Sequence, residues 1–105
     1  MTAALAARKS DVPPGSMKTL EVGGVRVALC NVDGAFYAIE DVCTHDDGPL
    51  GEGKLVEGQA ECPRHGARFD VKTGRATRMP AIIPVRTFPV KVEGDSVFVE
   101  VPHDA

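Results

Sequence analysis

The sequence predicts an all-β protein, and three observations support this class. Apolar residues alternate with polar ones over short stretches, which is the period of a half-buried strand. Pairs of turn-forming residues stand between these stretches, at Gly23-Gly24, Asp33-Gly34 and Gly94-Asp95. The chain also contains 11 glycines and 8 prolines, and it has no apolar stripe at the helical period.

The first group of expected strands lies before residue 42. Three strands are predicted there, at residues 17–22, 25–31 and 36–40. In the second of them, Val25, Val27 and Leu29 share one face, so that face is expected to be buried. Cys30 falls on the opposite face, where a free cysteine commonly serves as a small buried hydrophobe. We expect it to be chemically inert.

The second group lies near the end of the chain, with strands expected at residues 85–93 and 96–101 around Gly94-Asp95. Between about residues 42 and 84 the alternation fades, and glycine, proline and charge take over. The two flanks are therefore predicted to form an antiparallel β-sandwich or barrel base. The intervening segment is predicted to be a loop-rich insertion, the kind of region that commonly carries function.

Composition limits the classes of function. The 105 residues suffice for one domain, residues 1–105, and not for two. The hydrophobic fraction of 43% and charged fraction of 26% are ordinary for a folded protein, and the net charge of −3 gives no support to nucleic-acid binding. No apolar run is long enough for a membrane span, and the first ten residues lack the pattern of a signal peptide. We expect a cytoplasmic protein.

The insertion contains two of the three cysteines and two of the three histidines. They form two mixed pairs in the same order, Cys43 with His45 and Cys62 with His65. An odd and small number of cysteines is atypical of a secreted disulfide framework, so the two cysteines are better interpreted as metal ligands.

Thiolate together with imidazole suits both iron and zinc. A structural zinc module for protein interaction could use all four side chains around one ion, but zinc sites commonly pair cysteine with cysteine and histidine with histidine. Mixed pairs make chemical sense when the two halves of each pair bind different metal atoms. In a two-iron, two-sulfide cluster, one iron can take the two cysteines and the other the two histidines.

The stretch "CTH", the sixteen residues 46–61, and then "CPRHG" resembles the Rieske iron–sulfur motif. The likeness extends through "VDGAFYAIEDVCTH" and "AECPRHGARFDVKTG", and the chain is similar to the Rieske-type ferredoxins of biphenyl and carbazole dioxygenase systems. This resemblance implies the Rieske fold, with three stacked antiparallel sheets and a cluster-binding subdomain inserted at about residues 42–84.

The resemblance also implies the site. One Rieske-type [2Fe-2S] cluster is expected, with Cys43 and Cys62 on the inner iron and His45 and His65 on the outer, more exposed one. Turn-forming residues at matching positions would shape the loops around the cluster, bringing backbone N–H groups near its sulfurs or covering it: Gly48, Pro63, Gly66 and Pro80. His103 in the polar C-terminal tail is not expected to be a ligand.

The chain departs from the high-potential Rieske proteins at two pairs of positions. Gly48 and Arg64 stand where those proteins have an extra disulfide-bonded cysteine in each loop. Ala67 and Phe69 stand where they have a serine and a tyrosine whose hydroxyls donate to the cluster and a ligand sulfur. Each missing donor lowers the reduction potential. We therefore expect a potential near the lower end of the Rieske range, which runs from roughly −150 to +300 mV.

These features predict a one-electron carrier and not an enzyme in its own right. The expected partners are a flavin-dependent NAD(P)H reductase as donor and a terminal oxygenase or similar redox acceptor. The alternatives are the small Rieske subunit of an assimilatory nitrite reductase and the structural zinc module. Charged residues around the exposed histidines are expected to govern docking: Asp46, Asp47, Glu52, Arg64 and Arg68.

Overall fold

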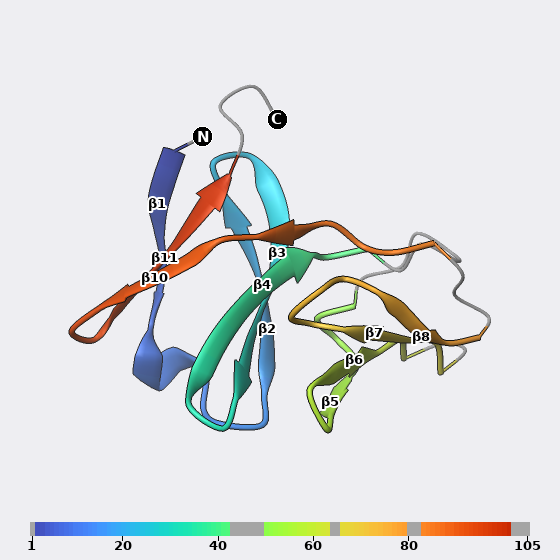
Figure 1. The fold of residues 1–105 in the computed structure, drawn as a ribbon. Helices are drawn as coiled ribbons and strands as arrows, with labels where there is room; N and C mark the ends of the chain where they lie inside the picture. The colour runs from blue at the N-terminus through green and yellow to red at the C-terminus, as the bar shows by residue number, and fades with distance from the viewer. Residues whose placement is uncertain (1, 43–49, 64–65, 80–82, 102–105) are drawn as a thin grey trace.

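The computed structural model describes residues 2–42, 50–63, 66–79 and 83–101. These residues form three antiparallel sheets and one short 3-10 helix, η1 (Lys9–Asp11). Sheet A has the strand order β1-β11-β10, sheet B the order β2-β3-β4-β9, and sheet C the order β5-β6-β7-β8. Figure 1 shows sheet B in the middle of the molecule, with sheet C on the right and sheet A on the left. The predicted all-β class is thus confirmed.

Sheets A and B form the base of the molecule. Sheet A consists of β1 (Thr2–Arg8), β10 (Val90–Glu93) and β11 (Ser96–Val101). Sheet B consists of β2 (Met17–Val22), β3 (Val25–Val32), β4 (Ala35–Glu40) and β9 (Thr87–Phe88). The three expected hairpins are present, because β2 pairs with β3, β3 with β4, and β10 with β11 in antiparallel register.

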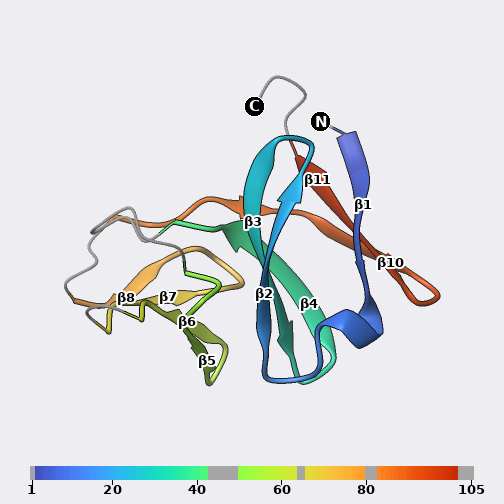
Figure 2. The same ribbon diagram turned by 180° about the vertical axis from the view of Figure 1, so that it is seen from behind.

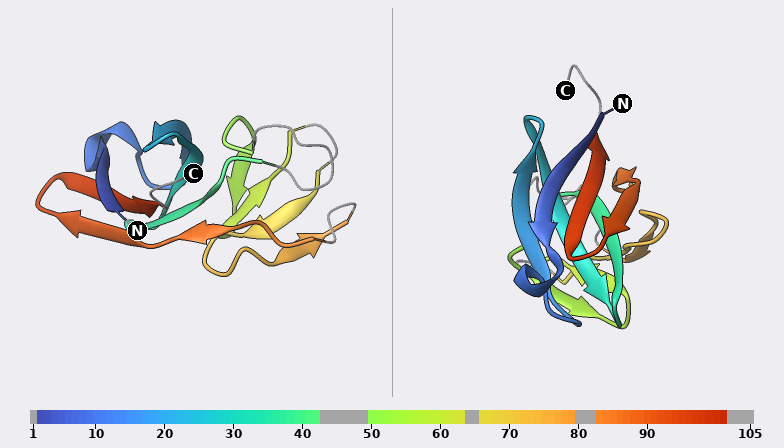
Figure 3. Two further views of the ribbon diagram at one scale, coloured as in Figure 1. Left: turned by 90° about the horizontal axis from the view of Figure 1, so that it is seen from above. Right: turned by 90° about the vertical axis from the view of Figure 1, so that its left-hand side faces the viewer.

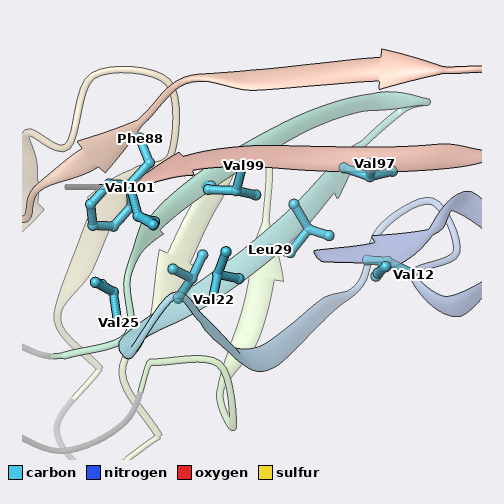
Figure 4. Packing of buried hydrophobic residues seen from close by; sticks show 11 residues of the cluster. Val12, Val22, Val25, Leu29, Phe88, Val97, Val99 and Val101 are labelled. Atoms are coloured by element: carbon cyan, nitrogen blue, oxygen red, sulfur yellow. The ribbon is translucent and has the colours of Figure 1, made fainter. Parts of the chain in front are cut away.

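The faces of sheet B alternate as predicted. Val27 and Leu29 of β3 are fully buried toward sheet A. They belong to the A–B core, which also contains Ala7, Val12, Val22, Val25, Ala38, Phe88, Val97, Val99 and Val101. Figure 4 shows side chains from β3 and from β11 turned toward one another in this core. Burying a branched aliphatic side chain is worth roughly 1.5–3 kcal/mol, so this core is a major source of stability for the base.

The other face of sheet B packs on sheet C. The B–C core contains Ala28, Cys30, Ile39, Leu50, Ala60, Cys62, Ala67, Phe69, Val71 and Val85. Sheet C consists of β5 (Lys54–Val56), β6 (Gln59–Glu61), β7 (Arg68–Asp70) and β8 (Ala76–Arg78). Seen from behind in Figure 2 and from above in Figure 3, these strands stand beside the base on the side away from β1.

Three features of the base and insertion differ from the expectation. The alanine-rich β1 was not predicted, because alanine has a low strand propensity; it forms by pairing along β11 from Thr2↔Val101 to Arg8↔Ser96. The segment 85–93 is not one strand, since Pro89 separates β9 in sheet B from β10 in sheet A. The insertion is also less loop-rich than expected, since it contains the four strands β5–β8. These were not predicted because a strand of three residues is too short to show an alternating pattern.

Candidate metal centre

The second ligand segment is a tight loop between β6 and β7. Cys62 follows β6 directly, and the side chain of this residue is only 1% exposed within the B–C core. The Cys62 N–H donates to the carbonyl of Ala67 at 2.7 Å, and the Gly66 N–H donates to the carbonyl of Cys62 at 3.1 Å. These two bonds fix the backbone on either side of the predicted ligand His65.

Gly66 has φ +73°, a left-handed conformation that favours glycine, so its predicted role in shaping this loop is confirmed. Because its own N–H donates to the Cys62 carbonyl, that group is not one of the donors expected near the cluster sulfurs. Cys43, His45, Gly48, His65 and Pro80 lie outside the described residues, and the ligand set as a whole therefore stays a prediction.

An ion pair closes the base of the same hairpin. Glu61 and Arg68 face each other across β6 and β7, and Arg68 Nε lies 2.8 Å from Glu61 Oε2. Both side chains are about three-quarters buried, and Arg78 approaches the same oxygen at 3.9 Å. Arg68 was expected in a docking rim, but its Nε–H donates to Glu61 within the sheet and its side chain is only 27% exposed. Its first role is to hold the hairpin that presents Cys62.

After the first ligand segment, the described chain resumes at Leu50, which is fully buried in the B–C core. A turn follows, in which the Gly53 N–H donates to the Leu50 carbonyl at 3.0 Å. A Cβ at Gly53 would lie within bonding range of the Glu61 carbonyl oxygen and 3.1 Å from the Pro63 ring. Only glycine at position 53 allows this close packing against Glu61 and Pro63. The contact brings the chain after the first ligand segment next to the second ligand segment.

The contact at Gly53 and the buried Asp41 were not found from the sequence. Asp41 is two residues before Cys43, and its side chain is fully buried. The available signal was an acidic residue directly after an apolar strand, but its partners, Arg26 and Gly51, are 15 and 10 residues away in the chain. A pattern of neighbours in sequence does not identify such contacts.

Cys30 and Cys62 are both buried free cysteines, and only one of them suits a metal. Burial, and secondarily the charge of Asp41, raise the pKa of Cys30 to about 12. Its S–H donates weakly to the Ala28 carbonyl at 3.7 Å, so it stays a protonated thiol near neutral pH. The predicted burial of Cys30 is confirmed, and a thiolate role for it is disfavoured.

The donor set and its placement fit an iron–sulfur cluster. Cys62 offers a buried thiol that is held by a short loop, and the first segment is anchored against that loop at Gly53. The predicted set of two thiolates and two imidazoles would match the needs of one iron with sulfur ligands and one with nitrogen ligands. The all-β fold and the buried Cys62, taken with this predicted set, indicate a class: a small all-β iron–sulfur protein.

Comparison with known proteins identifies the family within that class. Residues 2–89 match the Rieske [2Fe-2S] domain, and the chain belongs to this family. The biphenyl 2,3-dioxygenase ferredoxin component of Rhodococcus jostii is 47% identical over 90 residues, which are 86% of this chain and 84% of the relative. The 3-phenylpropionate/cinnamic acid dioxygenase ferredoxin subunit of Escherichia coli K12 is 43% identical over 95 residues, 90% of this chain and 89% of the relative.

Solved structures of ferredoxins have the same fold as this chain. The ferredoxin of carbazole 1,9a-dioxygenase from Nocardioides aromaticivorans superposes with a TM-score of 0.89 at 33% identity, covering 94% of this chain and 97% of that one. The ferredoxin of Sphingomonas yanoikuyae B1 gives the same TM-score at 30% identity, with 96% and 100% coverage. The predicted Rieske fold is therefore confirmed, and the cofactor of the protein is a Rieske-type [2Fe-2S] cluster.

Proposed function

We propose that this protein is the ferredoxin of a multicomponent aromatic-ring dioxygenase system, and that it carries one electron at a time to a terminal oxygenase. One observation carries the proposal: the relatives it matches over most of both lengths are named as ferredoxin components. By contrast, 95% of this chain corresponds to only 30% of the terminal oxygenase of carbazole 1,9a-dioxygenase, at 26% identity. The protein thus corresponds to the electron carrier and not to the oxygenase that performs the chemistry.

Four residues would hold the cluster in this proposal. Cys43 and Cys62 bind one iron as thiolates, and His45 and His65 bind the other as neutral imidazoles. The cluster, when bound, supplies a centre that accepts and releases one electron. The protein contributes Cys62, which is 1% exposed, and the buried B–C core to which Cys62 belongs. Fixed ligands change geometry little between redox states, which suits rapid electron transfer.

The electron donor in the proposal is a flavoprotein reductase that oxidises NADH or NADPH. Such a donor delivers electrons at low potential, and the cluster environment supports a low potential here. The side chains of Ala67 and Phe69 are fully buried and carry no hydroxyl, so neither can donate a hydrogen bond to a reduced cluster.

A complex of reduced oxygenase and oxidised ferredoxin is known for carbazole 1,9a-dioxygenase. One chain of that complex superposes on this protein with a TM-score of 0.85 at 37% identity, covering 92% of this chain and 91% of that one. We infer an equivalent complex for this protein. Of the charges expected at the docking rim, Glu52 is exposed, and Asp46, Asp47 and Arg64 lie outside the described residues.

The proposed cellular site is the cytoplasm, where Cys43 and Cys62 stay reduced for the cluster. In the described part of the chain, no helix has the length and apolar character of a membrane span.

The alternative nitrite reductase subunit receives no specific support. The structure of a putative nitrite reductase small subunit superposes with a TM-score of 0.83, but at 20% identity that likeness concerns the fold alone. The zinc module is set aside because the chain belongs to the Rieske family.

The test is a two-step reconstitution with purified components. NADH and a dioxygenase reductase should reduce the protein by one electron per chain, and anaerobic mixing with an oxidised aromatic-ring dioxygenase should reoxidise it while the oxygenase cluster is reduced. A variant with Asp46 and Asp47 both changed to lysine should alter the transfer rate in a salt-dependent way and keep the same absorption spectrum. Reduction without any transfer to the oxygenase would contradict the proposal.

A further inference from the structure

Asp41 is a buried carboxylate that connects three separate parts of the chain. It follows β4 directly, and its side chain has no exposed surface. One oxygen, Oδ1, accepts the Gly51 N–H at 2.6 Å, and the other, Oδ2, accepts Arg26 Nη2 at 3.2 Å. The Asp41 N–H in turn donates to the Arg26 carbonyl at 3.1 Å. A buried charge is costly unless it is hydrogen-bonded in this way, so these contacts define one conformation.

Two of the connected points enclose the first ligand segment. Asp41 lies just before it and Gly51 just after it, and Cys43 and His45 are between them in the sequence. Leu50 is fully buried, and a Cβ on Gly51 would overlap Thr19 Oγ1 of β2. Gly51 therefore packs closely against β2 of sheet B, and the Asp41 carboxylate accepts its N–H at the same point. Joining the two ends of a segment removes much of its conformational freedom before any ligand binds.

We propose that Asp41 is a positioning residue for the cluster: its bond to the Gly51 N–H fixes both ends of the first ligand segment on sheet B. Cys43 and His45 stand between these two held points in the sequence, and with Cys62 and His65 they make up the proposed ligand set. The inference rests on the proposed ligand set. The carboxylate acts through its acceptor oxygen, and Arg26, whose side chain is 60% exposed, contributes less because solvent screens its charge.

The test compares three single variants of the cluster-loaded protein. Asp41→Ala removes the acceptor and leaves the Gly51 N–H unpaired, whereas Asp41→Asn keeps an oxygen at the same place. Asn31→Ala is the matched control, because Asn31 is the other buried polar side chain in the described part of the chain and also makes two bonds. Its Nδ2 donates to the Val12 carbonyl at 2.7 Å, and its Oδ1 accepts the Gly34 N–H at 2.8 Å, both within the base.

Two quantities are measured for each variant: the rate at which a chelator removes iron, and the line shape of the electron paramagnetic resonance (EPR) signal of the reduced cluster. We expect Asp41→Ala to lose iron about 30-fold faster than the parent, the ratio that follows from losing one charge-assisted bond. Asp41→Asn should lose iron at most about threefold faster, because its neutral amide oxygen still accepts the Gly51 N–H. Asn31→Ala should lower the melting temperature but keep the parental iron-loss rate and line shape. Faster loss in Asp41→Ala with no rescue in Asp41→Asn would overturn the proposal.

A second pair of variants remains informative if Asp41→Ala fails to fold. Gly51→Ala should accelerate iron loss by displacing the backbone at residue 51. Adding Thr19→Ala should bring the rate back toward the parental value, because it removes the overlapping oxygen and leaves Thr19 Cβ and Asp41 Oδ1 each 3.2 Å from the added Cβ. Parental iron retention in Gly51→Ala would overturn the inference. In contrast, a parent protein that binds iron but shows no Rieske-type signal would refute the ligand set of the proposed function, and the positioning role with it.

Discussion

The two cores of this protein are built on opposite faces of the same sheet but by different means. In the A–B core, long strands contribute valine and leucine at every second position, and backbone pairing continues over six residues between β2 and β3. In the B–C core, the three-residue strands of sheet C are held by the close contact at Gly53 and the Glu61–Arg68 ion pair, and the buried Asp41 holds Gly51 beside sheet B. The base is therefore expected to fold by hydrophobic packing alone, whereas sheet C depends on a few specific contacts and on the cluster.

The largest effect expected from this contrast comes from removing a ligand. Cys62→Ala should abolish the Rieske-type EPR signal, because one iron loses a thiolate. Amide hydrogen exchange should then become fast throughout β5–β8 and remain slow in β3 and β11. If β3 and β11 lose protection to the same extent as sheet C, the two regions are one cooperative unit and the contrast is wrong.

A pair of leucines sharpens the comparison. Leu29 and Leu50 are both fully buried, the first in the A–B core and the second in the B–C core. Replacing either by alanine should cost about 2–5 kcal/mol in the free energy of unfolding, measured in denaturant. Only Leu50→Ala should also change the EPR line shape and speed iron loss, because Leu50 ends the first ligand segment. A changed line shape in Leu29→Ala would show that the two cores are coupled.

Sequence patterns predict these two regions unequally, and the reason is physical. In the base, the alternation of Val25, Val27 and Leu29 reflects one buried face, so fold class, hairpins and the face of Cys30 were predictable. The strand β1 was not, because its alanines become a strand only through pairing with β11.

In the site, the four ligands are predicted from a motif of local spacing, and of these only Cys62 lies in the described part of the chain. The contacts at Asp41 and Gly53 join residues distant in sequence and become visible only in the fold.

The environment of Cys62 gives a third prediction, which concerns redox potential. Ala67→Ser together with Phe69→Tyr supplies two hydroxyl donors at buried positions beside the ligand loop. We expect each to raise the potential by about tens of millivolts, because a donor stabilises the reduced state and about 59 mV corresponds to a tenfold change for one electron. Protein-film voltammetry on the parent and double variant measures the shift. No upward shift, or a parent value already well above zero, would contradict this interpretation.

The smallest expected effect concerns Cys30, on the face of sheet B that meets sheet C. Burial raises the pKa of Cys30 from 9.0 to about 12, so the unfolded chain loses this proton at lower pH than the folded one. Its contribution to stability is complete below pH 9 and is lost as the pH rises from 9 to 12. Between pH 8 and 10 the parent should lose about 1 kcal/mol more than Cys30→Ala in chemical denaturation. Equal losses would indicate that Cys30 is accessible to water.

The ligand set proposed for the cluster consists of two cysteines, Cys43 and Cys62, and two histidines, His45 and His65. Electron–nuclear double resonance on the reduced protein, prepared with nitrogen-15 histidine, tests it most directly. The chain contains three histidines, and the account predicts couplings from two of them, His45 and His65. The spectrum should be unchanged in His103→Gln and should lose one coupling when either ligand is replaced by cysteine. Coupling to no histidine, or a contribution from His103, would contradict the ligand set.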